Sequence, residues 1–120
     1  MKIFVFGSNL AGRHGKGAAK FARLNHGAIY GQGIGLQGSS YGIPTKGHKL
    51  AVLSFTEIAG HVDVFLAFAA AHPDMQFNVT RIGCGLAGYR DDQIGPLFKH
   101  APSNCVLPNE WHLWHRNPKE

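Results

Sequence analysis

Short β-rich runs alternate with helix-like segments along this chain of 120 residues. The predicted strands cover residues 2–6, 28–30, 40–45, 77–82 and 104–107. The predicted helices cover residues 17–25, 55–72 and 91–101. Strands that alternate with helices place parallel strands in one sheet, with helices packed against its faces. The alternation therefore predicts an α/β fold, layered around a mixed, largely parallel sheet. The length allows one domain over residues 1–120.

The helix predicted over residues 55–72 carries the clearest local signals. Residues 54–57 (SFTE) fit a capping box, in which the Ser and Glu side chains each bind the other residue's free backbone N–H. Four apolar residues then recur at helical spacing, namely Ile58, Val62, Phe65 and Ala69. Pro73 follows the predicted end. This helix is therefore expected to bury one face against the sheet.

Weaker signals place the other elements. Four side chains share one face of the helix over residues 17–25, namely Ala18, Phe21, Ala22 and Asn25. Residues 7–16 and 31–40 are predicted loops. Pro44 cannot donate a hydrogen bond to a neighbouring strand, so residues 40–45 are expected at an edge of the sheet. Pro96 has to lie in the first turn of the helix over residues 91–101.

The composition favours a folded, soluble, cytoplasmic protein. Hydrophobic residues make up 44% of the chain and charged residues 16%, which argues against disorder. No apolar run approaches the roughly 18 to 20 residues that a membrane-spanning helix needs. The first seven residues are too short and too strand-like for a signal peptide. Two cysteines, Cys84 and Cys105, are too few for a disulfide framework.

Charge and glycine are both concentrated in the first half of the chain. Seven Lys and Arg residues precede the first acidic residue, Glu57, although the net charge of the whole chain is only +5. Eleven of the 16 glycines lie in residues 1–47. Bare backbone and basic side chains suit a bound phosphate, because glycine lets N–H groups approach an anion closely. A nucleic-acid surface and a merely solvated basic face remain as alternatives.

Two glycine-rich loops follow predicted strands, and both are candidates for a ligand site. One spans residues 7–17 and leads into a helix, and the other spans residues 83–89. In a parallel sheet both would lie at the carboxyl ends of the strands, where ligands bind. Two such loops facing one crevice suit a diphosphate, and a helix N-terminus adds attraction for an anion. The alternative is that the glycines only form tight turns.

Several common motifs fail on inspection. Residues 13–17 (RHGKG) lack the glycine and the Ser or Thr that a Walker phosphate loop requires at Leu10 and Gly17. Residues 33–38 (GIGLQG) match the dinucleotide fingerprint, but the segment that follows cannot be the required helix. His112 and His115 lack further ligands, so no metal and no cofactor are expected. Cys84 is interpreted as a small buried residue in preference to a nucleophile.

Three segments resemble the ADP-ribose-binding macrodomains. Residues 6–19 (FGSNLAGRHGKGAA) are similar to the first ligand loop of that family. Residues 80–86 (TRIGCGL) resemble the second loop of the subclass that contains the terminal ADP-ribose protein glycohydrolase and its chromatin-remodeller relatives. Residues 41–46 (YGIPTK) resemble the segment with that enzyme's reactive lysine. Small phage-encoded proteins also look similar along most of the chain, which would place this one in a host cytoplasm.

The resemblance implies a macrodomain-like three-layer α/β/α fold, ADP-ribose or an ADP-ribosylated substrate as ligand, and a role for each matching residue. Lys46 would attack the anomeric carbon of an ADP-ribosyl group, with Asp91 or Asp92 resolving the adduct. The residues expected to contact the ligand are Gly7, Ser8, Asn9, Arg13, His14, Gly15, Lys16, Gly17, Ala18, Thr45, Gly83, Cys84, Gly85, Leu86, Ala87, Gly88 and Tyr89.

The sequence departs from the glycohydrolase pattern at Ala87, where that enzyme has an aspartate directly after its GCGL run. Three functions therefore remain open. The protein is an ADP-ribosyl hydrolase that uses Lys46, or a non-catalytic reader or sponge of an ADP-ribose-derived signal nucleotide. The third possibility is an accessory protein that binds nucleic acid through its basic charge.

Overall fold

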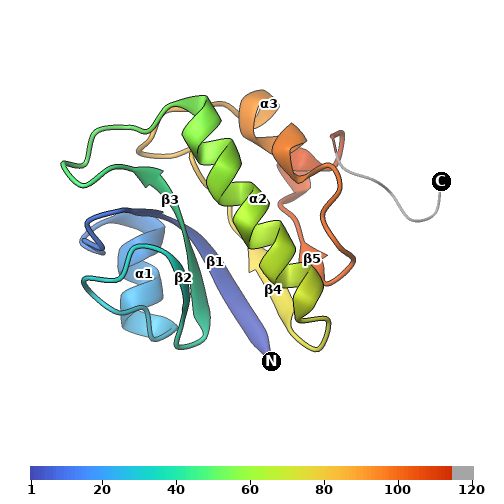
Figure 1. Ribbon diagram of the computed structural model, residues 1–120, viewed down its shortest axis with the longest axis horizontal. Coiled ribbons are helices and arrows are strands. Elements are labelled where there is room, and N and C mark those ends of the chain that lie inside the picture. Colours follow the sequence, from blue (N-terminus) through green and yellow to red (C-terminus); the bar gives the residue numbers. More distant parts are fainter. Residues whose placement is uncertain (115–120) are drawn as a thin grey trace.

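The computed structural model describes residues 1–114 and contains a five-stranded sheet with helices on both faces (Figure 1). The strand order is β2-β3-β1-β4-β5. The central strand β1 (Lys2–Asn9) runs parallel to β3 (Ser40–Lys46) and to β4 (Gln76–Val79). Strand β5 (Cys105–Val106) is parallel to β4, and β2 (Gly35–Gln37) is antiparallel to β3. The predicted mixed, largely parallel α/β sheet is confirmed.

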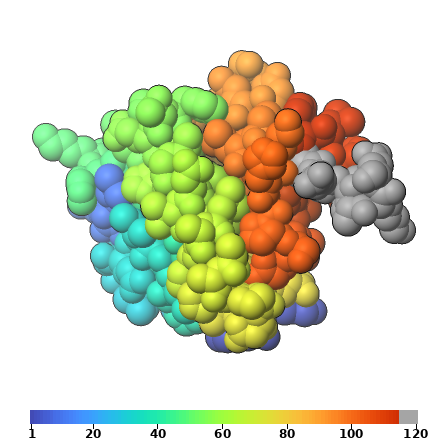
Figure 2. All heavy atoms as spheres, turned by 45° about the vertical axis from the view of Figure 1, so that its right-hand side comes forward, coloured from blue at the N-terminus to red at the C-terminus, as the bar shows by residue number. Residues whose placement is uncertain are grey.

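Side chains of β1 alternate between two cores, one on each face of the sheet. Ile3 and Val5 belong to the larger core, and Phe6 belongs to a smaller core beneath α1 (Gly17–Asn25). The larger core is covered by α2 (Phe55–Ala71), with α3 (Asp91–Ile94) beside it (Figures 1 and 2). Two 3₁₀ turns complete that side, at Gly95–Phe98 and Asn109–Trp111. The molecule therefore has three layers.

Local sequence signals determine α2. The Glu57 N–H donates to Ser54 Oγ at 3.2 Å, and the Ser54 N–H donates to a Glu57 carboxylate oxygen at 3.3 Å. The four predicted apolar positions, Ile58, Val62, Phe65 and Ala69, are fully buried. The capping box and the buried face are thus confirmed, and the helix ends one residue before the predicted end. On α1 the buried residues are Ala19 and Ala22, whereas Phe21 is half exposed.

Six sequence predictions about the elements are wrong in detail. Strand β1 continues to Asn9, into the predicted loop, because residues up to Asn9 pair with β3. Residues 28–30 form no strand, and β2 arises instead within the predicted loop 31–40. Strand β3 is interior and not at an edge, because β2 pairs with it over residues 40–42. Pro44 lies beyond the residues that pair with β2, so its missing N–H interrupts no hydrogen bond to that strand. Strand β4 ends at Val79, and the last predicted helix changes to a 3₁₀ turn at Gly95.

Many glycines of the first half allow two backbone segments to touch. Residues 27–39, which we name the crossing segment, run against the end of β1 and the loop that follows it. A Cβ atom at Gly12 would lie 2.2 Å from the carbonyl carbon of Gly31, and one at Gly33 would lie 2.2 Å from the oxygen of Asn9. No side chain fits at either contact. Gly12 and Gly33 therefore serve the packing of one backbone segment against another.

Candidate functional site

A cavity of about 550 Å³ opens at the carboxyl ends of β1, β3 and β4. It lies between loop one (residues 10–16, between β1 and α1) and loop two (residues 80–90, between β4 and α3). Its lining residues are Gly7, Ser8, Asn9, Arg13, Gly15, Lys16, Gly17, Ala18, Ala19, Tyr30, Thr45, Lys46, Leu50, Thr80, Arg81, Ile82, Gly83, Gly85, Leu86 and Ala87. The two glycine-rich loops that the sequence singled out therefore share one cavity.

Loop one is shaped by the amide of Asn9. Its Nδ2 donates to the Arg13 carbonyl at 2.8 Å, and its Oδ1 accepts from the Arg13 N–H at 2.8 Å. This pair of bonds closes the loop and leads the chain into α1, whose first residue lines the cavity. No side chain caps that helix, and its first turn holds no acidic residue. The partial positive charge of the helix N-terminus is thus open to an anion in the cavity.

Loop two is held by an ion pair beside the cavity. The Arg81 guanidinium donates to both carboxylate oxygens of Asp91, at 3.0 and 2.5 Å. The indole N–H of the fully buried Trp111 donates to the same carboxylate at 2.8 Å. Hydrogen bonding by Arg81, with help from Trp111, lowers the pKa of Asp91 to about 2. Arg81 itself lines the cavity, so Asp91 fixes the position of a cationic side chain at the site.

The two loops approach each other closely. Gly17, at the start of α1, would bring a Cβ atom to 3.7 Å from a methyl carbon of Leu86 on loop two. A Cβ atom at Gly7 would lie 3.6 Å from the Gly83 nitrogen and equally far from the Thr45 hydroxyl. Gly17 and Gly83 both adopt positive φ angles, 56° and 75°, which favour glycine. Glycine at these positions lets bare backbone form both walls of the cavity.

The cavity is lined by four cations, Arg13, Lys16, Lys46 and Arg81, and by no aspartate or glutamate among the residues that the structure describes. Lys46 is half-buried at the end of β3, next to Thr45, whose hydroxyl donates to the Ser8 carbonyl at 3.3 Å. Of the four, Arg81 is already paired with Asp91. The local charge therefore favours an anionic ligand.

Four residues predicted to contact the ligand do not line the cavity, namely His14, Cys84, Gly88 and Tyr89. His14 is fully buried, and its Nε2 lies 2.9 Å from the Gln32 carbonyl, so the imidazole ties loop one to the crossing segment. The Tyr89 hydroxyl donates to the Leu53 carbonyl at 2.7 Å, which anchors loop two next to α2. Neither side chain lines the cavity, and Gly88 does not line it either. His14 therefore stabilises loop one and Tyr89 stabilises loop two, and neither side chain is placed to contact a ligand in the cavity.

Cys84 belongs to loop two but does not line the cavity, so its prediction as a ligand contact is wrong. It is half-buried, and burial together with the neighbouring Asp91 carboxylate raises the pKa of its thiol to about 12. A thiol with that pKa stays protonated near neutral pH and is a poor nucleophile. This agrees with the preference for a small packing residue over a nucleophile, although Cys84 is half-buried where the sequence predicts a buried residue.

The two carboxylates predicted to assist Lys46 also lie outside the lining. The Asp91 carboxylate forms an ion pair with Arg81 and accepts a hydrogen bond from the Trp111 indole. The Asp92 carboxylate pairs with Arg90 at 3.0 Å on the exposed surface. Their position follows from the short helix α3, which begins at Asp91 and turns both residues toward arginines of loop two. Within residues 1–114, no three His, Cys, Asp or Glu side chains group as metal ligands, and His115 lies outside this range.

Six residues of the lining were not predicted, namely Ala19, Tyr30, Leu50, Thr80, Arg81 and Ile82. Arg81 had a usable signal, because it lies two residues before Gly83, the first glycine of loop two. Tyr30 had a weaker one, as an aromatic residue beside Gly31 in a glycine-rich stretch. Nothing in the sequence marks Leu50, whose place depends on the turn that precedes α2.

No family model, curated protein or solved structure matches this chain. The resemblance to the macrodomains therefore stays a prediction, and what can be stated of the class is an α/β protein with a basic cavity at the carboxyl ends of its parallel strands. None of the helices in residues 1–114 has the length and apolar character needed to cross a membrane.

Proposed function

We propose that the cavity binds ADP-ribose, or a closely related nucleotide with two linked phosphates, and that the protein reads this ligand without hydrolysing it. The observation that carries the proposal is the convergence of loops one and two on a single cavity. Backbone N–H groups of both loops and the open N-terminus of α1 suit the phosphates. A volume of about 550 Å³ also lies within the range of small-molecule sites.

Charge supports a diphosphate in particular. Arg13 and Lys16 come from loop one, Lys46 from β3 and Arg81 from loop two, so cations approach the cavity from three elements. Two linked phosphates can contact more of these groups at once than one phosphate can. Binding without turnover is favoured because the described lining offers no carboxylate to act as an acid or base toward the ligand.

Binding is tested by isothermal titration calorimetry and thermal shift with ADP-ribose, with uncharged adenosine as the matched control. Ligand at about one hundred times its Kd should stabilise the protein by about 2.7 kcal/mol. Lys16→Ala should weaken binding, whereas Lys20→Ala, on the exposed part of α1 outside the lining, should not. Absence of any heat or shift at millimolar ADP-ribose would contradict the proposal. Binding of an oligonucleotide with a steep salt dependence, and no response to ADP-ribose, would support a nucleic-acid partner.

Hydrolysis through Lys46 is the second candidate, because this amine does line the cavity. Incubation with an ADP-ribosylated peptide separates the two functions. Release of free ADP-ribose by the wild type, lost in Lys46→Ala and kept in Lys49→Ala, would assign turnover to Lys46. Lys49 is an exposed lysine three positions away and is not in the lining, which makes it the matched control.

A further inference from the structure

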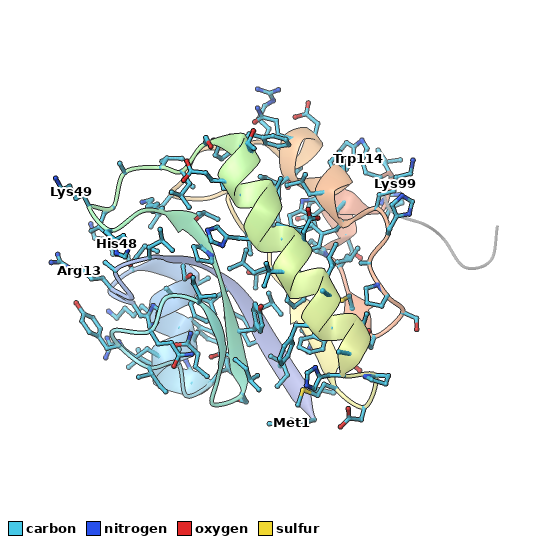
Figure 3. All side chains as sticks on the ribbon, in the orientation of Figure 1. Met1, Arg13, His48, Lys49, Lys99 and Trp114 are labelled. Atoms are coloured by element: carbon cyan, nitrogen blue, oxygen red, sulfur yellow. The ribbon has the colours of Figure 1, made fainter. Side chains whose placement is uncertain are left out.

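A short hairpin connects β3 to α2 beside the cavity. Lys46 and Val52 form an antiparallel bridge at its base, and the Gly47 N–H donates to the Ala51 carbonyl at 2.8 Å. At its tip the Leu50 N–H donates back to the Gly47 carbonyl at 3.1 Å, which closes a four-residue turn. This hairpin (residues 46–52) extends beyond the sheet in Figure 1, and in Figure 3 its His48 and Lys49 lie on the same side of the molecule as Arg13 of loop one.

The backbone of Leu50 adopts a conformation that leucine normally avoids. Its φ angle is 65°, and it is the one non-glycine residue with positive φ in the part of the chain that the structure describes. Hairpins with a turn of this kind usually place glycine at the left-handed position that follows it. Leucine there is strained by the contact of its Cβ atom with the backbone. Strain of this kind is found where the surrounding structure or a function requires it.

Burial in the free protein does not explain the strained leucine. The Leu50 side chain is 39% exposed, and it lines the cavity. Two other apolar side chains of the lining are also exposed, Tyr30 by 61% and Leu86 by 68%. The cavity thus combines cations with apolar side chains that remain in contact with water. A ligand that has a phosphate part and a less polar part would cover both kinds of group.

We propose that Leu50 determines specificity by packing on the non-phosphate part of the bound nucleotide, its ribose or base, and that the hairpin holds it in place for this contact. This inference rests on the proposed function, since it concerns the same cavity. The bridge at Lys46 fixes the base of the hairpin to β3, and the left-handed turn brings an apolar side chain to the cavity where glycine would bring none. Loops one and two would bind the phosphates, and Leu50 would contact only the rest of the nucleotide.

The test compares Leu50→Gly and Leu50→Ala with the wild type by calorimetry with ADP-ribose. Glycine relieves the strain and removes the side chain, whereas alanine keeps a Cβ atom and removes only the rest. Both variants should bind ADP-ribose about tenfold more weakly, because each loses the apolar contact. Leu24→Ala is the matched control, since Leu24 is exposed on α1 and outside the lining, and its affinity should be unchanged.

Salt dependence provides a second readout. The slope of log affinity against log salt concentration reports phosphate contacts, so it should be the same in both Leu50 variants as in the wild type. Equal affinity of wild type and both variants would overturn the role of Leu50 and leave the proposed function intact. A reduced slope would also overturn it, because the hairpin would then act through charge. Failure of the wild type to bind ADP-ribose would overturn both proposals. Circular dichroism at the start verifies that the variants are folded.

Discussion

Loops one and two form opposite walls of the same cavity and are stabilised in different ways. Loop one is fixed by close backbone packing and by hydrogen bonds to backbone groups: the Gly31 N–H donates to the Gly12 carbonyl at 2.7 Å, and the side-chain amide of Asn9 closes the loop on the backbone of Arg13. Loop two is fixed by side chains, chiefly the Arg81–Asp91 pair and its bond to Trp111. One wall therefore depends on glycine and close packing, and the other on charge.

This difference predicts how each wall responds to change. A Cβ atom cannot be added where two backbones touch, so loop one should tolerate few substitutions at its contacts. Loop two should tolerate small changes in side-chain volume, but its stability should fall when the Asp91 carboxylate is removed. Four measurements, given from the largest expected effect to the smallest, test this contrast.

Gly12→Ala should cause the largest loss. The φ angle of Gly12 is 70°, and the new Cβ atom would meet the backbone of Gly31 at 2.2 Å. Backbone strain and overpacking together should lower the free energy of unfolding by more than about 3 kcal/mol, enough to unfold a marginal protein. Urea denaturation measures the change. A loss below about 1 kcal/mol would show that the crossing segment can move away, contrary to the comparison.

Asp91→Asn should produce a moderate loss. The variant keeps an oxygen for the Trp111 indole but loses the charge that attracts Arg81. We expect the free energy of unfolding to fall by about 1 kcal/mol, because Arg81 is partly exposed and solvent screens the pair. Asp92→Asn is the matched control, since Asp92 pairs with Arg90 on the open surface and should change little. Equal decreases in the free energy of unfolding for the two variants would show that the Asp91 carboxylate does not stabilise loop two more than an exposed carboxylate does.

The pH dependence of that loss should identify its cause. Asp91 has a pKa of about 2 in the folded protein and an ordinary value of 3.8 in the unfolded chain. Its contribution to stability is therefore complete above about pH 4 and is lost as the pH falls through 2. The difference in melting temperature between wild type and Asp91→Asn should be constant from pH 7 to 5 and shrink below pH 4. A difference that persists at pH 2 would indicate a steric effect of the variant.

Gly15→Ala should have the smallest effect on stability. Gly15 lies in loop one, but no atom approaches the position of its missing Cβ within 4 Å, and its φ angle is not in the left-handed range. The free energy of unfolding should stay within about 0.5 kcal/mol of the wild type in urea denaturation. Together with Gly12→Ala, this variant separates glycines that pack from glycines that leave space for a ligand. A large loss would mean that the whole of loop one is packed.

Local signals were sufficient for some of the fold. The capping residues Ser54 and Glu57 and the spacing from Ile58 act within one helix, so the sequence shows them directly. Glycine is different, because Gly12 and Gly33 look like Gly15 along the chain and differ only in what lies across from them. Composition alone therefore does not separate the glycines that pack against backbone from those that border the cavity. Tertiary contacts between distant segments decide which glycines face the cavity.

The candidate site could be predicted in outline but not in its details. The two loops were located correctly because the carboxyl ends of parallel strands meet at one edge of a sheet. The resemblance to the macrodomains predicts His14 as a ligand contact, whereas burial and its bond to the Gln32 carbonyl place it in the interior. Leu50 is absent from the predicted site because its place at the cavity depends on a turn with left-handed backbone, which its sequence neighbours do not specify.

The bond from Trp111 to Asp91 has a practical consequence for spectroscopy. The chain has only two tryptophans, and both lie in its C-terminal part, at positions 111 and 114. Trp111 is stacked on Phe98, with ring centroids 4.9 Å apart, and its indole N–H touches the carboxylate behind loop two. Tryptophan fluorescence should therefore change when loop two rearranges and change little when loop one rearranges. One emission spectrum then distinguishes which of the two loops moves when a ligand binds.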